Sequence, residues 1–480
     1  MENICKDSSF AELGFDSLLM AELISRLKLE LPEQIELPIQ DILAISDVAS
    51  LIDLIQKQLK GTNIPEKSMK PALPTKVYSS EEQRWMELKH LPEYQKIQQT
   101  RTMLGEELAA QLYFNTINGI SDNCIQLEQT SLINFSGYNY LGYSGDERVI
   151  KLTCDAISNY GTSVSASRLI SGQKPVHMQL EQSISDLIST EDTVVFSAGH
   201  ATNISVITHL FGMEDVIFHD ALIHNSSLQG AIFSKAKRIP FPHNDFNTLA
   251  KLMATERSHY RRALVLIEGV YSMDGDIANV PEFIKVKNQY NAHLMIDEAH
   301  SIGVLGEHGA GICEYFNLSA NDIELWMGTL SKAFASCGGY VSGKKELMDY
   351  IRYSCAGFVF SAGISPANTT AALASIQLLR KEPHRPRLLQ KNAQRLLLDL
   401  KSHGINTGAS ENTPIIPIII GDEKKTVQLC LNLRQQGVYT HPIIYPAVEK
   451  DMARIRLFIN YMHTEEQLAY TAEMIYKYLA

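Results

Sequence analysis

Six short apolar runs alternate with helical patterns between about Val149 and Ser342, and each run ends in polar or glycine-containing residues. The runs are TVVFSAG, DVIFHD, ALVLIEG, HLMIDE, LWMGTL and GGYVSG. This alternation predicts a parallel sheet with crossover helices. Active residues in such sheets lie at the carboxyl ends of the strands. We therefore expect the segments SAGH, IHNS, EGVYSMDGD, IDEAH and TLSK to supply the functional site.

The stretch from Leu294 to Phe334 carries the most chemistry. Asp297 follows an apolar run, so its carboxylate is expected at the end of a buried strand, where a charge must be paired. His300 lies three residues further on, and Lys332 lies on a Ser-rich turn. These residues favour a pyridoxal phosphate (PLP) site, in which the carboxylate pairs with the pyridine nitrogen and the lysine carries the Schiff base.

Each of these residues also has an ordinary interpretation, and the motif has a rival. Most lysines are solvated, and an acid at a strand end often only caps a turn. The tetrapeptide DEAH also occurs in helicase-type ATPases, which require a GxxxxGK[ST] loop upstream. The nearest match, Gly338 to Lys345, follows the acids and lacks the final Ser or Thr. We therefore reject the ATPase interpretation.

Other strand ends supply further candidates. Gly199 and His200 in SAGHATN begin a helical pattern, and the backbone N–H groups of a helix start are a natural seat for a phosphate. His224 could stack on a pyridine ring, and Ser272 offers a hydroxyl. Thr329, close to Lys332, could bond a phosphate or a ring oxygen.

Composition limits the class of protein. The length of 480 residues predicts two or three domains, and the net charge of −11 argues against nucleic-acid binding. The N-terminus has no apolar signal region, and the longest apolar run, IIPIIIG, is too short for a membrane span. Seven scattered cysteines without a CxxC pair indicate reduced thiols in the cytoplasm, with neither a disulfide framework nor a metal site.

The first 60 residues differ from the rest. They contain eleven Asp and Glu against five Lys and Arg. A helix is predicted over about Leu18–Leu27 after a cap at Asp16 or Ser17, and a second over about Val48–Leu59 after Asp47. One interpretation is a small helical bundle in which Ser17 is only a cap. In the other, GFDSL resembles the phosphopantetheine attachment motif of acyl carrier proteins, which implies a partial carrier with 4'-phosphopantetheine on Ser17.

The remaining chain divides by pattern. We expect a linker over 61–78, an N-terminal segment over 79–145, a large domain over 146–365 and a smaller α+β domain over 366–480. Helices are predicted over Ser79–Leu91, Tyr94–Leu112 and Ala367–Arg380, with another at the C-terminus. Strand-like runs are Leu112–Asn115, Ile125–Leu127, Leu132–Phe135, TPIIPIII and ARIRLFIN.

Residues from about 90 to 480 closely resemble the α-oxoamine synthase family of PLP enzymes. The motifs are NFSGYNYLGYS, GTSVSASRLISG, SAGHATN, HNSSLQGA, EGVYSMDGD, IDEAHSIGVLGEHGAGICE, GTLSKAF and ARIRLFINYMHT. The resemblance implies an α/β fold of the PLP-dependent transferase type (fold type I), with a mostly parallel central sheet and a homodimeric active site. With the carrier-like segment, the chain resembles synthases attached to polyketide or fatty-acid assembly lines.

The resemblance also implies roles. Lys332 would hold PLP covalently and later remove the α-proton, Asp297 would bind the pyridine nitrogen, and His224 would stack on the ring. His300 and Ser272 would bind the phenolic oxygen. The residues assigned to the phosphate are Gly199, His200 and Thr329.

The implied reaction is a decarboxylative condensation of an amino acid with an acyl thioester of a carrier protein or CoA, giving an α-amino ketone. Asn139 and Arg456 would lie near the amino-acid carboxylate. His200 and Ala362 depart from the family pattern. Ser167 replaces a threonine of glycine-using relatives, so we expect alanine or serine to be preferred over glycine. The alternatives are an aminotransferase or decarboxylase of the same fold, or a non-catalytic subunit that recruits a carrier protein.

Overall fold

The computed structural model describes residues 23, 45, 47–59, 86–105, 112–445 and 447–479. The chain separates into two compact units, Met1–Gln98 and Gln99–Ala480, which are described individually. Ser17 lies outside the described residues, as does the expected linker over 61–78. The helix expected over Leu18–Leu27 also lies outside them, apart from residue 23.

Near the N-terminus, the second predicted helix is confirmed as α3, Val48–Leu59. Asp47 caps it by accepting hydrogen bonds from the backbone N–H of Ser50 at 2.8 Å and from its hydroxyl at 3.0 Å.

The next two helix predictions are partly wrong. Within the described part of Ser79–Leu91 the structure has only a short 3-10 turn, η1, Leu88–His90. Leu91 is extended because it precedes a proline, which disfavours helical geometry. The following helix, α5, is Pro92–Leu104, and Gly105 ends it with a φ of 83°. Residues 106–111 of the predicted helix lie outside the described residues.

The predicted sheet is confirmed in the second unit. Within the described residues it has seven strands in the order β4-β10-β9-β8-β7-β5-β6, and β10 runs antiparallel to both of its neighbours while the others are parallel. The strands are β4 Asp192–Phe196, β5 Val216–Asp220, β6 Lys237–Phe241, β7 Ala263–Glu268, β8 His293–Asp297, β9 Leu325–Thr329 and β10 Gly339–Gly343. Sequence patterning missed β6, because this edge strand is half exposed and lacks an apolar run.

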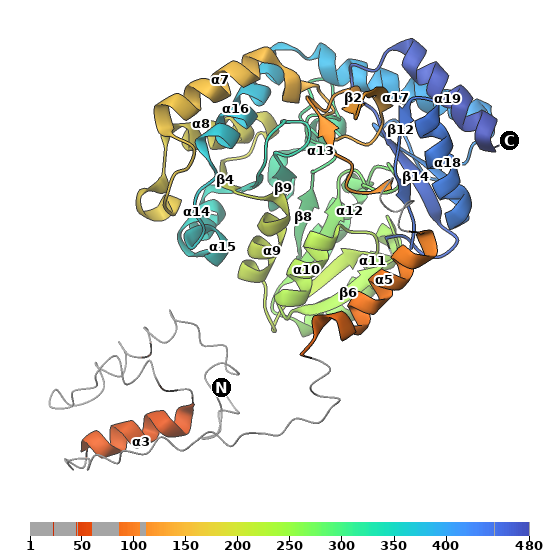
Figure 1. The fold of residues 1–480 in the computed structure, drawn as a ribbon. Helices are drawn as coiled ribbons and strands as arrows, with labels where there is room; N and C mark the ends of the chain where they lie inside the picture. Colours follow the sequence, from red (N-terminus) through yellow and green to blue (C-terminus); the bar gives the residue numbers. More distant parts are fainter. Residues whose placement is uncertain are drawn as a thin grey trace. The chain divides into compact units, whose positions relative to one another are not determined.

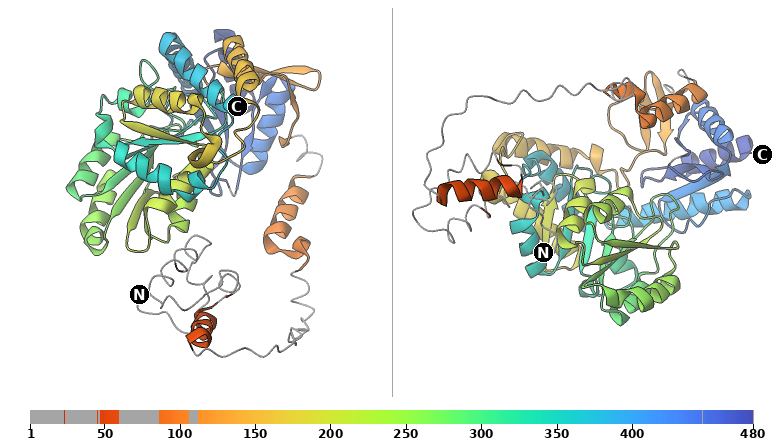
Figure 2. Two further views of the ribbon diagram at one scale, coloured as in Figure 1. Left: turned by 90° about the vertical axis from the view of Figure 1, so that its left-hand side faces the viewer. Right: turned by 90° about the horizontal axis from the view of Figure 1, so that it is seen from below.

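Both faces of this sheet are covered by helices (Figures 1 and 2). Alternate side chains of β7 point to opposite faces, so Leu264 and Leu266 join one apolar core while Val265 and Ile267 join another. Every residue of β7 is therefore buried, and polar chemistry is confined to its ends. The covering helices include α8 Pro175–Ile188, α9 Gly199–Leu210, α10 Asn225–Phe233, α11 Phe246–Glu256, α12 Val280–Gln289, α14 Lys345–Ser354, α15 Ala356–Val359 and α16 Pro366–Lys381.

Two smaller sheets complete this unit. The first has the order β1-β2-β3-β12 and the second the order β11-β14-β13. Their strands are β1 Ile117–Asn118, β2 Cys124–Leu127, β3 Thr130–Asn134, β11 Ile415–Gly421, β12 Val438–Tyr439, β13 Pro442–Ile443 and β14 Ala453–Phe458. The strand predicted over Leu112–Asn115 is wrong, because Phe114 has a φ of 58°, which breaks an extended chain.

The remaining helices lie mainly in the C-terminal part. They are α7 Glu147–Tyr160, α13 Ile312–Tyr315, α17 His384–Ser402, α18 Glu423–Gln435 and α19 Glu465–Leu479. Short turns are η2 Tyr143–Gly145, η3 Arg168–Gly172, η4 Arg257–His259 and η5 Ala320–Asp322. None of the helices in the described part of the chain is long and apolar enough to cross a bilayer.

Gly275, in the loop after β7, gives a test of this packing. It has a φ of +70°, and a Cβ there would collide with the carbonyl oxygen of Ile415. Gly404 has a similar φ of +72° but no atom near its Cβ position. Gly404→Ala should lower the free energy of unfolding by about 1 kcal/mol, and Gly275→Ala by about 3 kcal/mol, because it adds a collision. Urea unfolding of both variants measures this, and equal losses would contradict the packing at Gly275.

Candidate active site

A cavity of about 330 Å³ lies at the carboxyl edge of the central sheet, large enough for a small ligand. The sequence-predicted residues that line it are Gly199, His200, His224, Ser272, Asp297, His300, Thr329, Lys332 and Arg456. The lining residues that sequence analysis missed are Tyr138, Asn203, Ser226, Glu268, Met273, Ala299 and Met327.

Asp297 ends β8 and is held as a hydrogen-bond acceptor. Its Oδ2 accepts from Asn203 Nδ2 at 2.8 Å, and its Oδ1 accepts from the backbone N–H of Ala299 at 2.9 Å. The residue is buried, with 6% of its surface exposed. Two donors on a buried carboxylate stabilise its charge, so Asp297 is prepared to pair with a cation in the cavity.

Glu268 ends β7 and pairs in register with Asp297 on the neighbouring strand. Its Oε2 accepts a long hydrogen bond from Ser272 N at 3.4 Å, and its Oε1 has no hydrogen-bond partner among the described residues. Burial and the nearby charge of Asp297 raise the pKa of Glu268 well above its usual range. Glu268 therefore holds its proton more strongly than a free glutamate does, and Asp297 is the better hydrogen-bonded of the two carboxyl groups.

Lys332 follows β9 and is linked to two other residues. Its Nζ lies 2.7 Å from His300 Nε2, and His300 Nδ1 lies 2.8 Å from the hydroxyl of Tyr140. Burial lowers the pKa of Lys332 to about 8, although Asp297 and Glu268 oppose this. Burial and the Lys332 charge lower the pKa of His300 well below its usual value. The imidazole is therefore neutral, and a substantial fraction of the amine is neutral near pH 8.

His224 and His200 come from the starts of two helices. His224 caps α10, and its Nδ1 accepts a hydrogen bond from the backbone N–H of Ser226 at 3.2 Å. Burial lowers the pKa of His224 despite the Asp297 charge. The rings of His200 and His224 meet edge to face, with centroids 6.2 Å apart. Since Nδ1 is an acceptor, the proton of neutral His224 lies on Nε2.

Thr329 and Gly199 are in close contact. A Cβ at Gly199 would lie 2.9 Å from Thr329 Oγ1, so only glycine leaves the start of α9 this close to β9. Thr329 Oγ1 donates to the carbonyl of Gly338 at 3.0 Å and accepts from Ser331 N at 3.2 Å. The N-terminus of α9, whose first N–H groups have no partner within the helix, thus borders the cavity and suits an anion.

Arg456 reaches the cavity from β14 in the small sheet. Its Nη1 donates to the carbonyl of Ser272 at 2.6 Å, and its guanidinium lies 4.4 Å from the ring centre of Phe458. The same phenyl ring is nearly parallel to the imidazole of His300. Nε of Arg456 is buried and has no partner in the described part of the chain. Arg456 thus brings a guanidinium, the side chain best suited to a carboxylate, to the cavity wall.

Three predicted residues lie elsewhere. Asn139 is not among the cavity-lining residues; its Nδ2 donates to Ser121 O at 3.2 Å and to Asp122 Oδ1 at 3.4 Å. Ser167 also does not line the cavity, and its hydroxyl accepts from Leu169 N at 3.3 Å. Ser17 lies outside the described residues. Their roles remain predictions.

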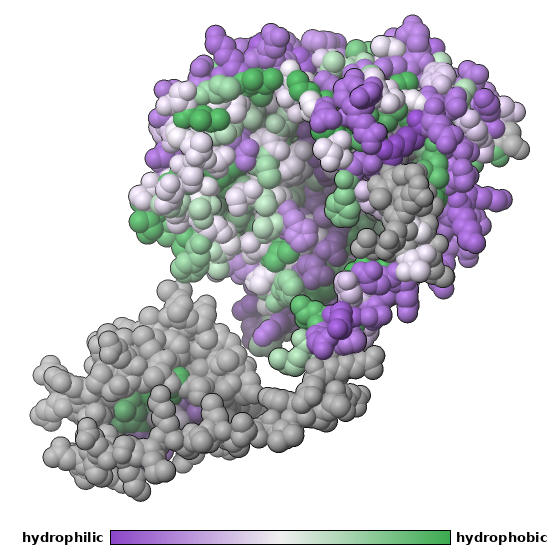
Figure 3. Space-filling model, in the orientation of Figure 1, coloured by the Kyte–Doolittle hydropathy of each residue, from purple (hydrophilic) through white to green (hydrophobic). Residues whose placement is uncertain are grey.

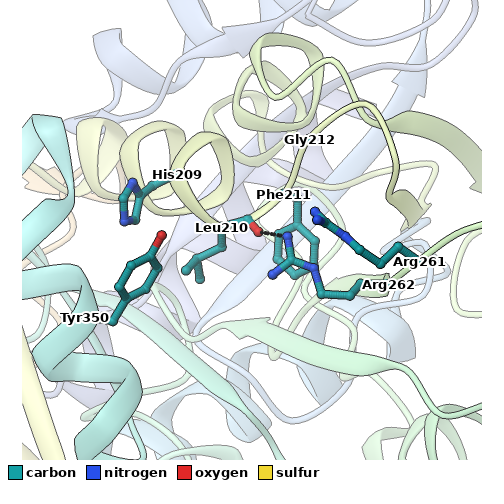
Figure 4. A pocket seen from close by; sticks show the side chains of 7 residues that line it. All are labelled: His209, Leu210, Phe211, Gly212, Arg261, Arg262 and Tyr350. Atoms are coloured by element: carbon teal, nitrogen blue, oxygen red, sulfur yellow. Dashed lines mark hydrogen bonds between the residues drawn. The ribbon is translucent and has the colours of Figure 1, made fainter. Parts of the chain in front are cut away.

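A second cavity, of about 530 Å³, lies at the opposite end of the sheet, beside the last turn of α9 (Figure 4). Arg261 and Arg262 line it, but both are paired with the buried Asp215, at 3.3 and 2.8 Å. Arg262 Nη2 also donates to Leu210 O at 2.6 Å. Arg261 also pairs with Glu214 at 3.0 Å, so two acids balance the two arginines of this cavity. The smaller cavity is therefore the better candidate for chemistry.

Glu268 and Tyr140 are the informative omissions. Glu268 ends the run ALVLIE in the same way that Asp297 ends HLMID, so the rule that selected Asp297 applied to it as well. Tyr140 lies in NYLG, far from His300 in sequence, and no local pattern pairs them. Only the fold brings their side chains together.

Comparisons with known proteins place the chain in a family. A sequence-family model described as aminotransferase class I and II matches residues 130–475. An 8-amino-7-oxononanoate synthase of Petrotoga mobilis is 37% identical over 76% of this chain and 92% of its own length. A serine palmitoyltransferase of Sphingobacterium spiritivorum is 35% identical over 74% and 88%. The chain belongs to the α-oxoamine synthases.

Solved structures agree with this family. The serine palmitoyltransferase of S. paucimobilis with a bound PLP–myriocin aldimine has a TM-score of 0.77 at 27% identity, covering 81% of this chain and 98% of that one. That of Sphingomonas wittichii has a TM-score of 0.76 at 29% identity, covering 81% and 97%. The predicted family and α/β fold of the PLP-dependent transferase type are thus confirmed. A second model, described as phosphopantetheine attachment site, matches residues 2–55 and supports the carrier-like interpretation.

The cavity of this α-oxoamine synthase fits PLP. Asp297 is a buried carboxylate with room for a cationic partner, and Lys332 offers an amine of lowered pKa. The contact of Gly199 with Thr329 leaves the α9 N-terminus open to a phosphate. The donor set and the electrostatics therefore match the needs of the cofactor.

Glu298, next to Asp297, predicts a pH dependence of stability. Ile312 N donates to its Oε1 at 2.8 Å, but burial raises its pKa from 4.5 to about 8. The unfolded state loses this proton first, so the stability that Glu298 contributes is present below pH 4.5 and is lost as pH rises to about 8. Glu298→Gln removes this loss. Relative to the wild type, its free energy of unfolding should rise between pH 5 and 8 by on the order of 4 kcal/mol.

Urea unfolding at several pH values measures this difference. Glu307, an exposed carboxylate, provides the control variant Glu307→Gln. Parallel pH curves for wild type and Glu298→Gln would contradict a neutral Glu298.

Proposed function

We propose that this chain condenses alanine, serine or glycine with an acyl thioester to form an α-amino ketone, carbon dioxide and a free thiol. The main support is that Lys332, Asp297 and His300 line one cavity. The chain is also similar to 8-amino-7-oxononanoate synthase and serine palmitoyltransferase. The amino-acid α-carbon loses a proton and bonds to the thioester carbonyl carbon as the C–S bond breaks. The condensed product then loses its carboxylate as carbon dioxide, and the α-carbon takes up a proton to give the α-amino ketone.

Bound PLP would supply an electron sink for the negative charge that develops on the α-carbon. We propose that Lys332 holds the cofactor covalently, Asp297 pairs with its pyridine nitrogen, and His224 stacks on its ring. His300 and Ser272 would bind the phenolic oxygen. The residues proposed for the phosphate are Gly199, His200 and Thr329.

The chain's own groups suit the proton transfers. Lys332, with a pKa near 8, can accept the α-proton at neutral pH when it is free, because the amine is then partly unprotonated. His300 contacts it at 2.7 Å and stays neutral, so it adds no competing charge. Arg456 lines the cavity and is proposed to bind the amino-acid carboxylate with its guanidinium. We retain Asn139 as a second carboxylate contact and Ser167 as a determinant of the amino acid.

The acyl donor is proposed to be a carrier-protein thioester or acyl-CoA. Similarity of residues 2–55 to phosphopantetheine attachment sites supports a carrier-type donor, with Ser17 as the proposed attachment residue. A carrier-bound acyl group is tethered, which raises its effective concentration at the cavity.

Mass spectrometry of the products tests the proposed function directly. Alanine, serine and glycine are supplied with acyl-CoA or acyl-carrier donors, and Lys332→Ala serves as the inactive control. We expect an α-amino ketone that requires the acyl donor, with alanine or serine preferred. Release of a keto acid without a donor would indicate an aminotransferase, and a strong glycine preference would contradict the role of Ser167.

A matched pair of variants tests the two strand-end carboxyls. Asp297→Asn should weaken PLP binding by about 10- to 100-fold, because it removes a charge-assisted contact. Glu268→Gln should change binding by less than about 3-fold, because the amide keeps the shape of a carboxyl group whose pKa is raised well above its usual value. Absorbance titration of the cofactor-free variants with PLP measures both. Equal losses would show that Glu268 also carries charge.

We also propose a homodimer. Gly363 N donates to Ala166 O at 3.1 Å, so the loops before η3 and after α15 lie together. Ile170, in η3, and Phe360, which follows α15, are exposed at 80% and 70%. Figure 3 shows apolar side chains on the left of the unit, where Figure 1 draws α15. Ile170→Asp should shift sedimentation toward the monomer, whereas Met213→Asp, at another exposed apolar side chain, should not.

A further inference from the structure

An imidazole held between two buried carboxylates lies beside the cavity without lining it. His243 follows β6, and its Nδ1 lies 3.0 Å from Asp220 Oδ1 while its Nε2 lies 3.0 Å from Asp276 Oδ2. Asp220 and Asp276 are buried, with 0% and 4% of their surfaces exposed. We call these three residues the His243 clamp. It joins the end of β5 to the loop after β7.

The Asp220 side of the clamp is fully bonded. Its Oδ1 accepts from Leu222 N at 2.8 Å, and its Oδ2 accepts from Asn244 N at 2.7 Å and from the Tyr271 hydroxyl at 2.9 Å. Asp220 also begins the short segment that leads to His224. Asp220 is therefore held in place by several donors at the end of β5.

The Asp276 side depends more on His243. The loop after β7 folds back on itself, with Val270 bridged to Ile277 and Tyr271 N donating to Asp276 O at 3.1 Å. Oδ1 of Asp276 is buried and unpaired in the described residues, so His243 is its main source of compensating charge. Asn244 Nδ2 also donates to Asp276 Oδ2 at 3.4 Å and to Ile277 O at 3.1 Å, but it brings no charge. Removing the His243 charge would therefore leave the buried Asp276 carboxylate with uncharged donors only, among the contacts of the described residues.

The tip of the same loop accepts hydrogen bonds from two arginines of β14. Ser272 O accepts from Arg456 Nη1 at 2.6 Å. Arg454 Nη1 donates to Met273 O at 3.2 Å and to Asp274 Oδ1 at 2.6 Å. A movement of the loop therefore shifts the acceptor that orients the Arg456 guanidinium.

The charge on His243 is maintained at physiological pH. Burial lowers its pKa, but the hydrogen bonds and charges of Asp220 and Asp276 outweigh this and raise it to about 10. Tyr271 faces it edge-on, with ring centroids 4.3 Å apart. Glu411 lies near Asp276, and burial and the Asp276 charge raise its pKa. His243 is thus a cation at neutral pH and loses this charge only in alkali.

We propose that His243 is a positioning residue for amino-acid binding: as a cation between Asp220 and Asp276, it fixes the loop whose tip orients Arg456 toward the substrate carboxylate. This inference rests on the proposed function, because it assigns the carboxylate of that substrate to Arg456. A purely structural clamp would lower stability without changing the affinity for the amino acid.

The test compares three variants. Asp276→Asn loosens the loop side while Asp220 still pairs with His243, and His243→Gln removes the charge. Arg262→Gln is the matched control, because it also weakens an ion pair to a buried aspartate but at the opposite end of the sheet (Figure 4). Amino-acid affinity is measured from the absorbance change of the PLP-loaded protein without acyl donor, and PLP affinity is measured separately.

We expect Asp276→Asn to weaken amino-acid binding by on the order of 10-fold with PLP affinity changed less than about 3-fold. The control should leave both unchanged. Unaltered amino-acid affinity in Asp276→Asn, or an equal loss in Arg262→Gln, would overturn the proposal. His243→Gln is informative only as a folded protein, so Asp276→Asn decides the outcome.

The pH dependence gives a readout that does not need the cofactor. NMR of histidine-labelled protein should show the His243 imidazole, identified by its absence in His243→Gln, titrating near pH 10. In Asp276→Asn it should titrate at lower pH, because one stabilising carboxylate is lost. Amino-acid affinity should fall as His243 loses its proton in alkali, and in Asp276→Asn this fall should occur at the same lower pH as the His243 titration. A His243 titration that Asp276→Asn leaves unchanged would overturn the proposal. If the wild type shows no response to any amino acid, the proposed function fails as well.

Discussion

Two carboxyl groups in register at the ends of neighbouring buried strands govern the electrostatics of the candidate site. Burial and the neighbouring Asp297 charge raise the pKa of Glu268, because two adjacent carboxylates in a buried site repel each other. Asn203 and Ala299 donate to Asp297, whereas Glu268 has one long hydrogen bond. Asp297 is therefore the better-stabilised carboxylate of the pair. This difference creates a specific place for a cation and lets Lys332 lie close by without full protonation.

The side chains that stabilise the sheet and those that line the cavity lie at the same edge of the sheet. The interior of β7 is buried on both faces, so it can hold no polar group, and its terminal residues carry all of its chemistry. Buried acids at this edge have different partners. Asp297 relies on hydrogen bonds from Asn203 and Ala299, and Asp276 relies on the charge of His243. Each charge is compensated locally, which keeps the edge ordered while the cavity stays open.

The small sheet contributes to the site through one loop. Arg456 lies on β14, remote in sequence from β7, and reaches the cavity because its guanidinium bonds the carbonyl of Ser272. Gly275 lets that loop pass close to β11. The loop after β7 thus joins the large sheet to the small one.

Local pattern determined much of this protein. Apolar runs ending in polar residues located six of the seven central strands, and the motifs around Asp297, His300 and Lys332 located the site, because strand burial and strand-end chemistry are local properties of sequence. Patterning failed at β6, an edge strand with exposed side chains, and at Leu112–Asn115, where one left-handed residue breaks an apolar run. Tertiary structure alone decided the contacts between distant segments. It placed Tyr140 on His300, left Glu268 without the donors that Asp297 receives, and enclosed His243 between two acids, since charge and hydrogen bonding depend on neighbours that no local pattern specifies.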